Sequence, residues 1–227
     1  MTAVAETKSL KTCLEECKML KTYKILSLLL SYPNDELQQF LAEVGAELKN
    51  EGLLSSEKVG EIEKFTAHFI RMDLTDWQAE YVQLFDYSRS VSLHLFEHIK
   101  GDSKDRGQAM VDMLEFYNEN GMQLSTNELP DYIPVFLEFL STLEVGKAAG
   151  LLAEPVHIIQ RIFLALEEKE NPYQYVLSAI VALSARRPEE KATKAVIQNE
   201  KPLDLDAEYE EEPVEFGGDN SCKNCKK

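Results

Sequence analysis

Apolar residues recur at helical spacing through most of the chain, and residues that cap or stop helices interrupt them. The apolar series within residues 10–29 keeps a helical period until Pro33 ends it. Asn34 and Ser55 then stand where N-caps would open further helices. Strand signals are nearly absent, because no hairpin turn is flanked by alternating β-branched residues. The sequence therefore predicts an all-α fold.

Capping motifs and proline or glycine stops mark the remaining helix boundaries. They are the capping boxes Thr75-x-x-Gln78 and Ser125-x-x-Glu128, Ser103 and Gly121 at the two ends of one helix, Pro155 in the first turn of another that runs to about Lys169, and Asn171-Pro172 at the start of the last, which ends near Arg187-Pro188. The loops between these helices are short, so consecutive helices should pack as neighbours in a single-domain bundle.

The chain divides into three parts. Residues 1–20 form an N-terminal extension that continues into the first helix, and residues 21–187 form the helical domain. Residues 188–227 form an acidic tail that ends in a Cys-x-x-Cys pair, with eight carboxylates against one lysine between positions 200 and 216. The tail contains too few apolar residues for their burial to offset the conformational entropy lost on ordering. We therefore expect the tail to be disordered.

Charge and hydropathy limit the partners and the compartment. The net charge of −16 repels phosphate backbones, which argues against nucleic-acid binding and favours a basic partner, although solubility alone would also explain it. No apolar stretch reaches the roughly 18 residues of a membrane span. The N-terminus lacks the basic and apolar regions of a secretory signal. We therefore expect a cytoplasmic protein without stable membrane insertion.

Motifs of catalysis and metal binding find little support. The chain has no glycine-rich phosphate loop and no nucleophile elbow, so we predict neither an enzyme nor a bound cofactor. Cys13/Cys17 and Cys222/Cys225 could be two halves of a zinc site, but nothing in their linear order brings them together. His94 and His98 would share a helix face without an obvious third ligand, which favours a partly buried or partner-contacting pair. We predict no metal site.

Residues 77–140 are rich in aromatic side chains with charged residues set directly beside them. Most of these aromatic residues are explained by a core, but charges at Asp86 and Glu97 next to large apolar groups are not. An apolar groove rimmed by carboxylates would suit a basic amphipathic helix. The candidate peptide-binding residues are Tyr81, Leu84, Phe85, Asp86, Arg89, Leu95, Phe96, Glu97, His98, Asp105, Arg106, Glu128, Pro130, Asp131, Tyr132 and Phe136.

The same region resembles a known family. Residues 81–86 (YVQLFD), 92–98 (SLHLFEH), 103–112 (SKDRGQAMVD) and 128–141 (ELPDYIPVFLEFLS) closely resemble NarJ-type nitrate reductase assembly chaperones, within the wider group of TorD/DmsD-like chaperones of molybdoenzymes. The resemblance spans about residues 20–186. It leaves out the first twenty residues and the cysteine-bearing tail.

The resemblance implies an all-helical chaperone that binds the N-terminal segment of the apo catalytic subunit of a respiratory nitrate reductase. Such a chaperone holds its client in the cytosol until molybdenum cofactor and iron–sulfur clusters are inserted, and is not part of the mature enzyme. Two alternatives stay open. One is a sister chaperone of another membrane-bound molybdoenzyme, and the other is a helical regulatory adaptor without a cofactor role.

The wider family's signature, E-P-x-D-H, is altered in this sequence. Glu128 and Asp131 match it, the proline lies one position later at Pro130, and Tyr132 stands where the histidine would be. Tyrosine does not titrate near pH 7, so the sequence does not support a histidine-based pH switch at position 132.

Overall fold

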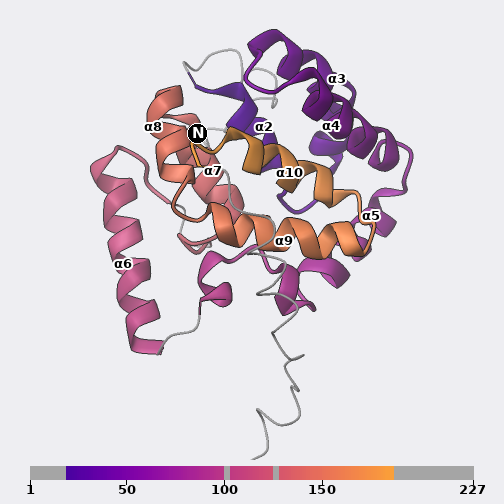
Figure 1. Cartoon of the computed structure of the whole chain (residues 1–227). Helices are drawn as coiled ribbons and strands as arrows, with labels where there is room; N and C mark the ends of the chain where they lie inside the picture. The colour runs from indigo at the N-terminus through magenta and orange to yellow at the C-terminus, as the bar shows by residue number, and fades with distance from the viewer. Residues whose placement is uncertain (1–18, 100–102, 125–127, 187–227) are drawn as a thin grey trace, which may run out of the picture.

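A computed structural model describes residues 19–99, 103–124 and 128–186, and these residues fold into helices throughout (Figure 1). The helices are α2 (Lys21–Leu29), α3 (Asp35–Glu51), α4 (Ser56–Phe69), α5 (Leu74–Phe85), the 3-10 helices η1 (Arg89–Val91) and η2 (Leu95–His98), α6 (Ser103–Glu119), α7 (Ile133–Ser141), α8 (Val145–Leu152), α9 (Val156–Glu168) and α10 (Tyr173–Leu183). Within the described residues there is no strand, only an isolated antiparallel bridge between His94 and Tyr132. The predicted all-α fold is confirmed.

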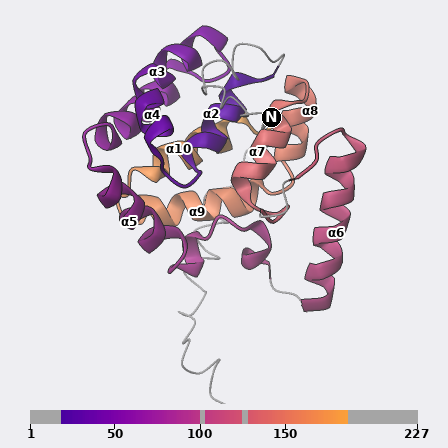
Figure 2. The ribbon, with the colours of Figure 1, turned by 180° about the vertical axis from the view of Figure 1, so that it is seen from behind.

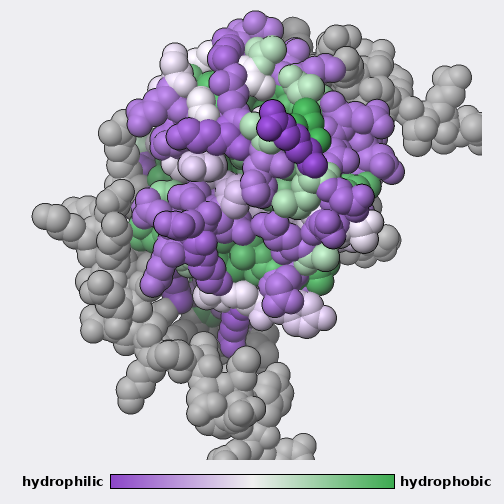
Figure 3. Space-filling view, turned by 90° about the vertical axis from the view of Figure 1, so that its right-hand side faces the viewer, coloured by the Kyte–Doolittle hydropathy of each residue, from purple (hydrophilic) through white to green (hydrophobic). Residues whose placement is uncertain are grey.

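Most helices pack around one core, whereas α6 stands at the edge. Helix α2 packs against α7 and α3, while α10 packs against α9 and α4. Figures 1 and 2 show α6 beside α7 and α8 at the outer edge of the bundle. The C-terminal half of α6 is anchored, since Tyr117 is buried and Phe116 packs on the same core. The side of the molecule that carries α3, α4 and α5 is predominantly hydrophilic (Figure 3), in keeping with the acidic composition.

Several predicted caps are confirmed by hydrogen bonds. Asn34 opens α3, and its side chain accepts from the backbone N–H of Leu37 at 2.8 Å. Ser55 does the same for α4, accepting from Lys58 at 3.3 Å. The stop at Gly121 is also confirmed, because Gly121 has a φ of +85° and lies two residues after Glu119, where α6 ends.

Two predicted capping boxes were wrong. The cap of α5 is Asp73, whose carboxylate accepts from the backbone N–H of Thr75, and Gln78 instead donates to the carbonyl of Pro33. Helix α7 begins at Ile133, so Glu128 lies before it rather than in its first turn; Ser125 lies outside the described residues. At α5 the pair has box spacing, but the carboxylate of Asp73, two residues before Thr75, is the acceptor that caps the helix.

The later boundaries differ by small amounts from the prediction. Pro155 is the N-cap residue of α9, and α10 begins at Tyr173, whose N–H donates to the Asn171 side chain at 3.0 Å. Helix α8 was not expected. The acidic tail (188–227), the Cys pairs and nearly all of the N-terminal extension (1–20) lie outside the described residues.

An aromatic cluster forms the centre of the bundle. Phe69 stacks on Trp77 with ring centroids 4.9 Å apart. The Phe69 ring also packs against the ring of Tyr173, with centroids 5.3 Å apart. The Trp77 Nε1–H donates to the Tyr173 hydroxyl at 2.8 Å, so both polar groups are satisfied within the core. We call Phe65, Phe69, Trp77 and Tyr173 the closed cluster; all four are fully buried.

Candidate functional site

The segment that carries η1 and η2 is fastened to the start of α7. The Leu95 N–H donates to the Asp131 carbonyl at 3.0 Å, and the Ile133 N–H donates to the Leu93 carbonyl at 2.9 Å. These bonds and the bridge between His94 and Tyr132 hold two segments side by side that lie almost forty residues apart in the sequence. The two segments with the densest charge among aromatic residues thus become one structural unit.

Asp131 is the buried polar centre of this unit. Its side chain has 0% exposure. One carboxylate oxygen accepts from the Phe96 N–H at 3.1 Å, and the other lies 3.3 Å from His94 Nδ1. The hydrogen bond to Asp131 raises the pKa of His94 against the opposing effect of burial. Asp131 therefore orients His94 and fixes η2, and it has no surface to offer a partner directly.

Three aromatic side chains extend the unit toward α2. The His94 ring stacks on Tyr132 with centroids 5.1 Å apart. The Tyr81 hydroxyl donates to the Leu30 carbonyl and lies 2.8 Å from the Tyr132 hydroxyl, so Tyr132 is the donor in that pair. Burial is the main cause that raises the pKa of Tyr132 to about 12, and Tyr132 stays protonated at neutral pH.

A small pocket of about 240 Å³ opens where these groups meet the surface. It is lined by Tyr32, Tyr81, Phe85, Asp86, Leu93, His94, Glu128 and Tyr132. Asp86 and Glu128 are exposed. Tyr32, Tyr87 and Leu129, which line the pocket or are next in sequence to lining residues, are 50%, 77% and 46% exposed. We call the lining residues together with Tyr87 and Leu129 the rim pocket; it combines large exposed apolar groups with two carboxylates.

A larger hollow of about 640 Å³ lies elsewhere, between α4, α9 and α10. Two of its four charged residues pair with each other. Lys58 Nζ lies 2.7 Å from a Glu61 carboxylate oxygen and 2.6 Å from the Ser178 hydroxyl. The rim pocket is the better candidate in spite of its size, because its aromatic residues Tyr32 and Tyr87 are exposed, whereas Phe163 and Tyr175 of the larger hollow are half-buried.

Known proteins with similar sequences identify the family. The family profile described as nitrate reductase delta subunit matches residues 54–177, which include both segments of the rim pocket. The Escherichia coli K12 nitrate reductase molybdenum cofactor assembly chaperone NarJ is 36% identical over 204 residues, covering 87% of this chain and 86% of that protein. This chain belongs to the NarJ-type nitrate reductase assembly chaperones.

Two further relatives agree with this membership. A protein of the same organism, assigned as the assembly chaperone NarW, is 34% identical and covers 87% of this chain and 84% of its own length. A crystal structure assigned as a redox enzyme maturation protein from Archaeoglobus fulgidus aligns with a TM-score of 0.50 and 25% identity, covering 70% of this chain and 88% of that one. The family consists of chaperones rather than catalysts, so this chain is not an enzyme.

No single helix of the described residues is long and apolar enough to cross a membrane. Among the described helices, one pair, α8 and α9, reaches the length and composition of a membrane span when taken together, and its two helices are bent by 71° against each other.

The structure brings together a subset of the predicted peptide-binding residues. Tyr81, Phe85, Asp86, Glu128 and Tyr132 line the rim pocket. Sequence reasoning did not predict Tyr32 and Leu93, and it predicted His94 only as one of a partly buried or partner-contacting pair. Tyr32 stands directly before Pro33, where the first helix was predicted to end, and its 50% exposure follows only from the fold. Leu93 and His94 line the pocket because their segment pairs with residues 131–133. No local sequence pattern predicts this long-range pairing.

The other predicted residues lie around the pocket or beneath it. Leu95, Pro130, Asp131 and Phe136 are buried; the Pro130 carbonyl accepts from Tyr117, and Phe136, 6% exposed, belongs to the core. Leu84, Phe96, Glu97, His98 and Arg106 are half-buried, and Arg89 and Asp105 are exposed. None of these eleven residues lines the pocket.

The two histidines do not share a helix face. His94 precedes η2 and turns to Asp131, whereas His98 ends η2 and its Nε2 lies 2.8 Å from the Ser92 carbonyl. Burial lowers the pKa of His98, opposite to the shift of His94. No group of three or more His, Cys, Asp or Glu side chains in the described part of the chain could hold a metal ion. The prediction of a shared face was wrong because the segment is 3-10 helix and loop.

Proposed function

We propose that this chaperone binds the N-terminal segment of the apo catalytic subunit of a respiratory nitrate reductase at the rim pocket. Binding would keep the client cytosolic and competent to receive molybdenum cofactor and iron–sulfur clusters before membrane attachment. The observation that carries the proposal is the coincidence of exposed aromatic residues with Asp86 and Glu128 around one opening. The names of the NarJ and NarW relatives support the client class.

The size of the pocket favours a peptide over a cofactor. Pockets that enclose small molecules usually measure about 300–1,000 Å³, and the rim pocket measures about 240 Å³. That space suits one or two anchor side chains of an amphipathic helix whose remaining apolar face lies on Tyr32 and Tyr87. Basic residues of the helix would then meet Asp86 and Glu128. The cofactors belong to the client, and we assign no chaperone residue to them.

Apolar anchors and rim charges should contribute differently to binding. Buried aromatic contacts carry most of the affinity in such interfaces. Solvent-exposed ion pairs add only about 0.2–1 kcal/mol each and weaken with salt. The rim carboxylates should therefore mainly raise the association rate.

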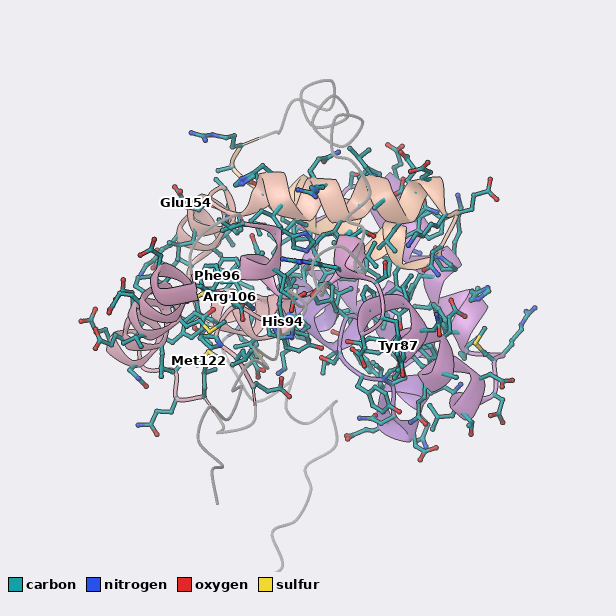
Figure 4. The ribbon with its side chains drawn as sticks, turned by 90° about the horizontal axis from the view of Figure 1, so that it is seen from below. Tyr87, His94, Phe96, Arg106, Met122 and Glu154 are labelled. Carbon is teal, nitrogen blue, oxygen red and sulfur yellow. The ribbon has the colours of Figure 1, made fainter. Side chains whose placement is uncertain are left out.

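The double variant Asp86→Asn/Glu128→Gln tests the charge contribution. In calorimetric titrations of the full chain with a synthetic client N-terminal peptide, we expect a loss of about 0.4–2 kcal/mol at low salt, from two pairs of about 0.2–1 kcal/mol each. The loss should shrink at high salt. Glu144→Gln/Glu154→Gln is the matched control, because both residues are exposed and Glu154 lies far from Tyr87 (Figure 4). Equal effects of the two double variants would place the binding site elsewhere.

Experiments in cells distinguish the proposed function from the two alternatives. In a deletion strain we expect loss of nitrate reductase activity together with low molybdenum content of the reductase. Capture of a different molybdoenzyme by the full chain would indicate a sister chaperone. Normal cofactor content in the deletion strain would instead indicate an adaptor without a cofactor role.

A further inference from the structure

The outer face of α10 is open in the larger hollow, although the composition of this helix is typical of a buried one. Figure 1 shows α10 between α4 and α9, which form the two walls of the hollow. Helix α10 contains no charged residue, and a helix of that composition is normally covered on all sides. Its residues in the hollow are nevertheless half-buried or exposed; they are Gln174, Tyr175, Ser178, Val181 and Ala182. The described residues thus leave this helix without an outer cover.

A buried amide group opens into the same hollow. Gln160 on α9 lines it and is only 3% exposed. No hydrogen bond joins its side chain to another described residue, whereas Lys58, Glu61 and Ser178 bond to one another. Buried amides nearly always have a hydrogen-bond partner. The occupant of the hollow should therefore bring a polar group to Gln160.

The charged residues that line the hollow set a limit on the charge of this occupant. Lys58 pairs with Glu61, and Glu57 and Glu167 remain. Both are exposed, and neither pairs with another described residue. The lining by itself therefore has an excess of two carboxylates, which disfavours an acidic occupant.

Charged groups next to the lining bring the balance close to neutral. Lys64 lies 5.6 Å from the centroid of the Tyr175 ring. Residues 168–170 at the end of α9 add two carboxylates and one ammonium group, and Arg186 adds a guanidinium at the other end. With these included, five carboxylates stand against four cations. The occupant should therefore be a neutral segment, held by apolar contacts and hydrogen bonds more than by charge.

The chain itself continues from one end of this hollow. Val181 and Ala182 line that end, and Arg186, the last residue of the described C-terminal part, follows four positions later. The Ala185 N–H donates to the Ala149 carbonyl at 3.0 Å and fixes the point where the chain leaves α10. Six residues span at most about 20 Å. A segment that begins at residue 188 therefore starts within about 20 Å of Ala182.

The composition of residues 188–199 (PEEKATKAVIQN) suits the open face of α10. The segment has two acidic and two basic residues, whereas residues 200–216 hold eight carboxylates and one lysine. Pro188 followed by two glutamates is typical of the first turn of a helix. Ala192, Ala195 and Val196 would then share one small apolar face. Helices of about twelve residues are marginal alone in water, so this one requires a surface to pack on.

We propose that residues 188–199 form a helix that lies in the larger hollow of its own chain, antiparallel to α10. The tether gives an effective concentration in the millimolar range, so weak contacts suffice. The lining face of α10 extends over eight residues from Gln174 to Ala182, or about 12 Å, and a helix of twelve residues is about 18 Å long. The segment is therefore long enough to cover the whole open face.

This orientation also provides a partner for Gln160. Helices α9 and α10 are joined by a short connection between Glu168 and Tyr173, so Gln160 and Val181 lie at the same end of the hollow. The first turn of the docked helix lies at that end as well. Its backbone N–H groups have no acceptor within the helix and can donate to the side-chain oxygen of Gln160.

A nitroxide near the end of the segment tests this docking in the full chain. The label is attached to Gln198→Cys in a protein whose four native cysteines are replaced by serine. In the docked helix the label lies near Glu167 and Gln174, so we expect their amide signals to broaden more than those of Val181 and Ala182. A tail that only moves about its attachment at Arg186 gives the reverse order. That order, or no broadening at Glu167 and Gln174, would overturn the proposal and leave the hollow to another occupant.

Aspartate substitutions on either surface identify the contact. Ala195→Asp/Val196→Asp on the segment and Ala182→Asp on α10 should each reduce the broadening of the Glu167 and Gln174 signals severalfold. The Ala182 side chain is exposed, so the described fold does not depend on it. Ala42→Asp, at an exposed position of α3, is the matched control and should leave the broadening unchanged. Unchanged amide shifts in α2 and α7 show that each variant is folded. Equal broadening in Ala182→Asp and Ala42→Asp would refute docking at this hollow.

An isotope mixture distinguishes docking within one chain from docking between two copies. Spin-labelled protein at natural abundance is mixed with ¹⁵N protein that carries no label. We expect no broadening of the Glu167 and Gln174 signals in the ¹⁵N protein. Broadening of full strength would mean that the segment occupies the hollow of a second copy, which contradicts docking within its own chain.

Discussion

Two neighbouring groups of aromatic residues in this chaperone use tyrosine in opposite ways. In the closed cluster, the Tyr173 hydroxyl accepts from Trp77 and every ring is buried. At the rim pocket, Tyr81 and Tyr132 also pair their hydroxyls, but Tyr32 packs edge-on against Tyr81 while half of its surface faces solvent. The two groups touch, since the Phe85 and Tyr173 rings are 4.9 Å apart.

The difference shows how a small bundle can support a binding surface. The closed cluster satisfies all its polar groups internally and gains its stability from complete burial. The rim pocket rests on it through Tyr81 and Phe85 and is thereby preorganised, yet it leaves apolar surface exposed. Substitutions in the closed cluster should therefore change stability, and those at the rim should change binding.

The largest expected effect is that of Phe69→Ala in the closed cluster. Removing a fully buried phenyl ring costs about 3–5 kcal/mol, because burial is lost and a cavity remains. Urea unfolding of the full chain measures this loss. Tyr32→Ala is the matched control and should lose less than about 1 kcal/mol, as its ring is half exposed. Similar losses for both variants would erase the distinction between the two groups.

Asp131→Ala should have the next largest effect, because it removes the buried acceptor beneath the rim pocket. The Phe96 N–H would lose its charged partner, at a cost of about 1.5–3 kcal/mol. Asp86→Ala, at an exposed carboxylate of the same pocket, should stay within about 0.5 kcal/mol. Chemical denaturation compares the two. An Asp131 variant as stable as the Asp86 variant would contradict the positioning role of Asp131.

Tyr32→Ala should weaken client binding more than it weakens the fold. We expect about a tenfold loss of affinity for the client peptide, or about 1.4 kcal/mol, since exposed aromatic anchors dominate such interfaces. The loss should be the same at low and high salt, in contrast to that of the rim carboxylates. Calorimetric titration at two salt concentrations measures it. Tyr175→Ala, on α10 beside the larger hollow, is the control and should leave binding unchanged.

The smallest expected effects are the pH dependences of the two histidines. The folded pKa of His94 is raised above 6.5, so its pairing with Asp131 stabilises fully below about pH 6.5 and is lost as pH rises through the folded pKa. The folded pKa of His98 is lowered, so its contribution is present above about pH 6.5 and is lost as pH falls.

Urea unfolding of His94→Gln and His98→Gln across pH 5–9 checks these signs. The stability deficit of His94→Gln should be largest at acid pH and remain under about 1 kcal/mol, as befits a partly exposed pair. The deficit of His98→Gln should grow toward alkaline pH. Parallel curves for the two variants would show that the histidines share one environment.

The sequence by itself determined the helices and the family. Apolar period and caps at Asn34, Ser55 and Gly121 are local properties, because each depends on residues within one or two turns, and they placed most boundaries correctly. The motifs in residues 81–86, 92–98 and 128–141 identified the chaperone family, because each motif is a continuous stretch of sequence and does not depend on the fold. They also named five of the eight residues that line the rim pocket.

Only the tertiary structure decided which motif residues face a partner. Asp131 and Phe136 belong to the same family motif as Glu128, but both are buried whereas Glu128 is exposed. Burial depends on which segments pack together in the fold, and Asp131 is covered by residues 93–96. The signature lacks a histidine at Tyr132, yet an imidazole lies beside this position, because His94 stacks on that tyrosine and pairs with Asp131. Such a contact joins residues almost forty positions apart. It follows from packing, which no local spacing encodes.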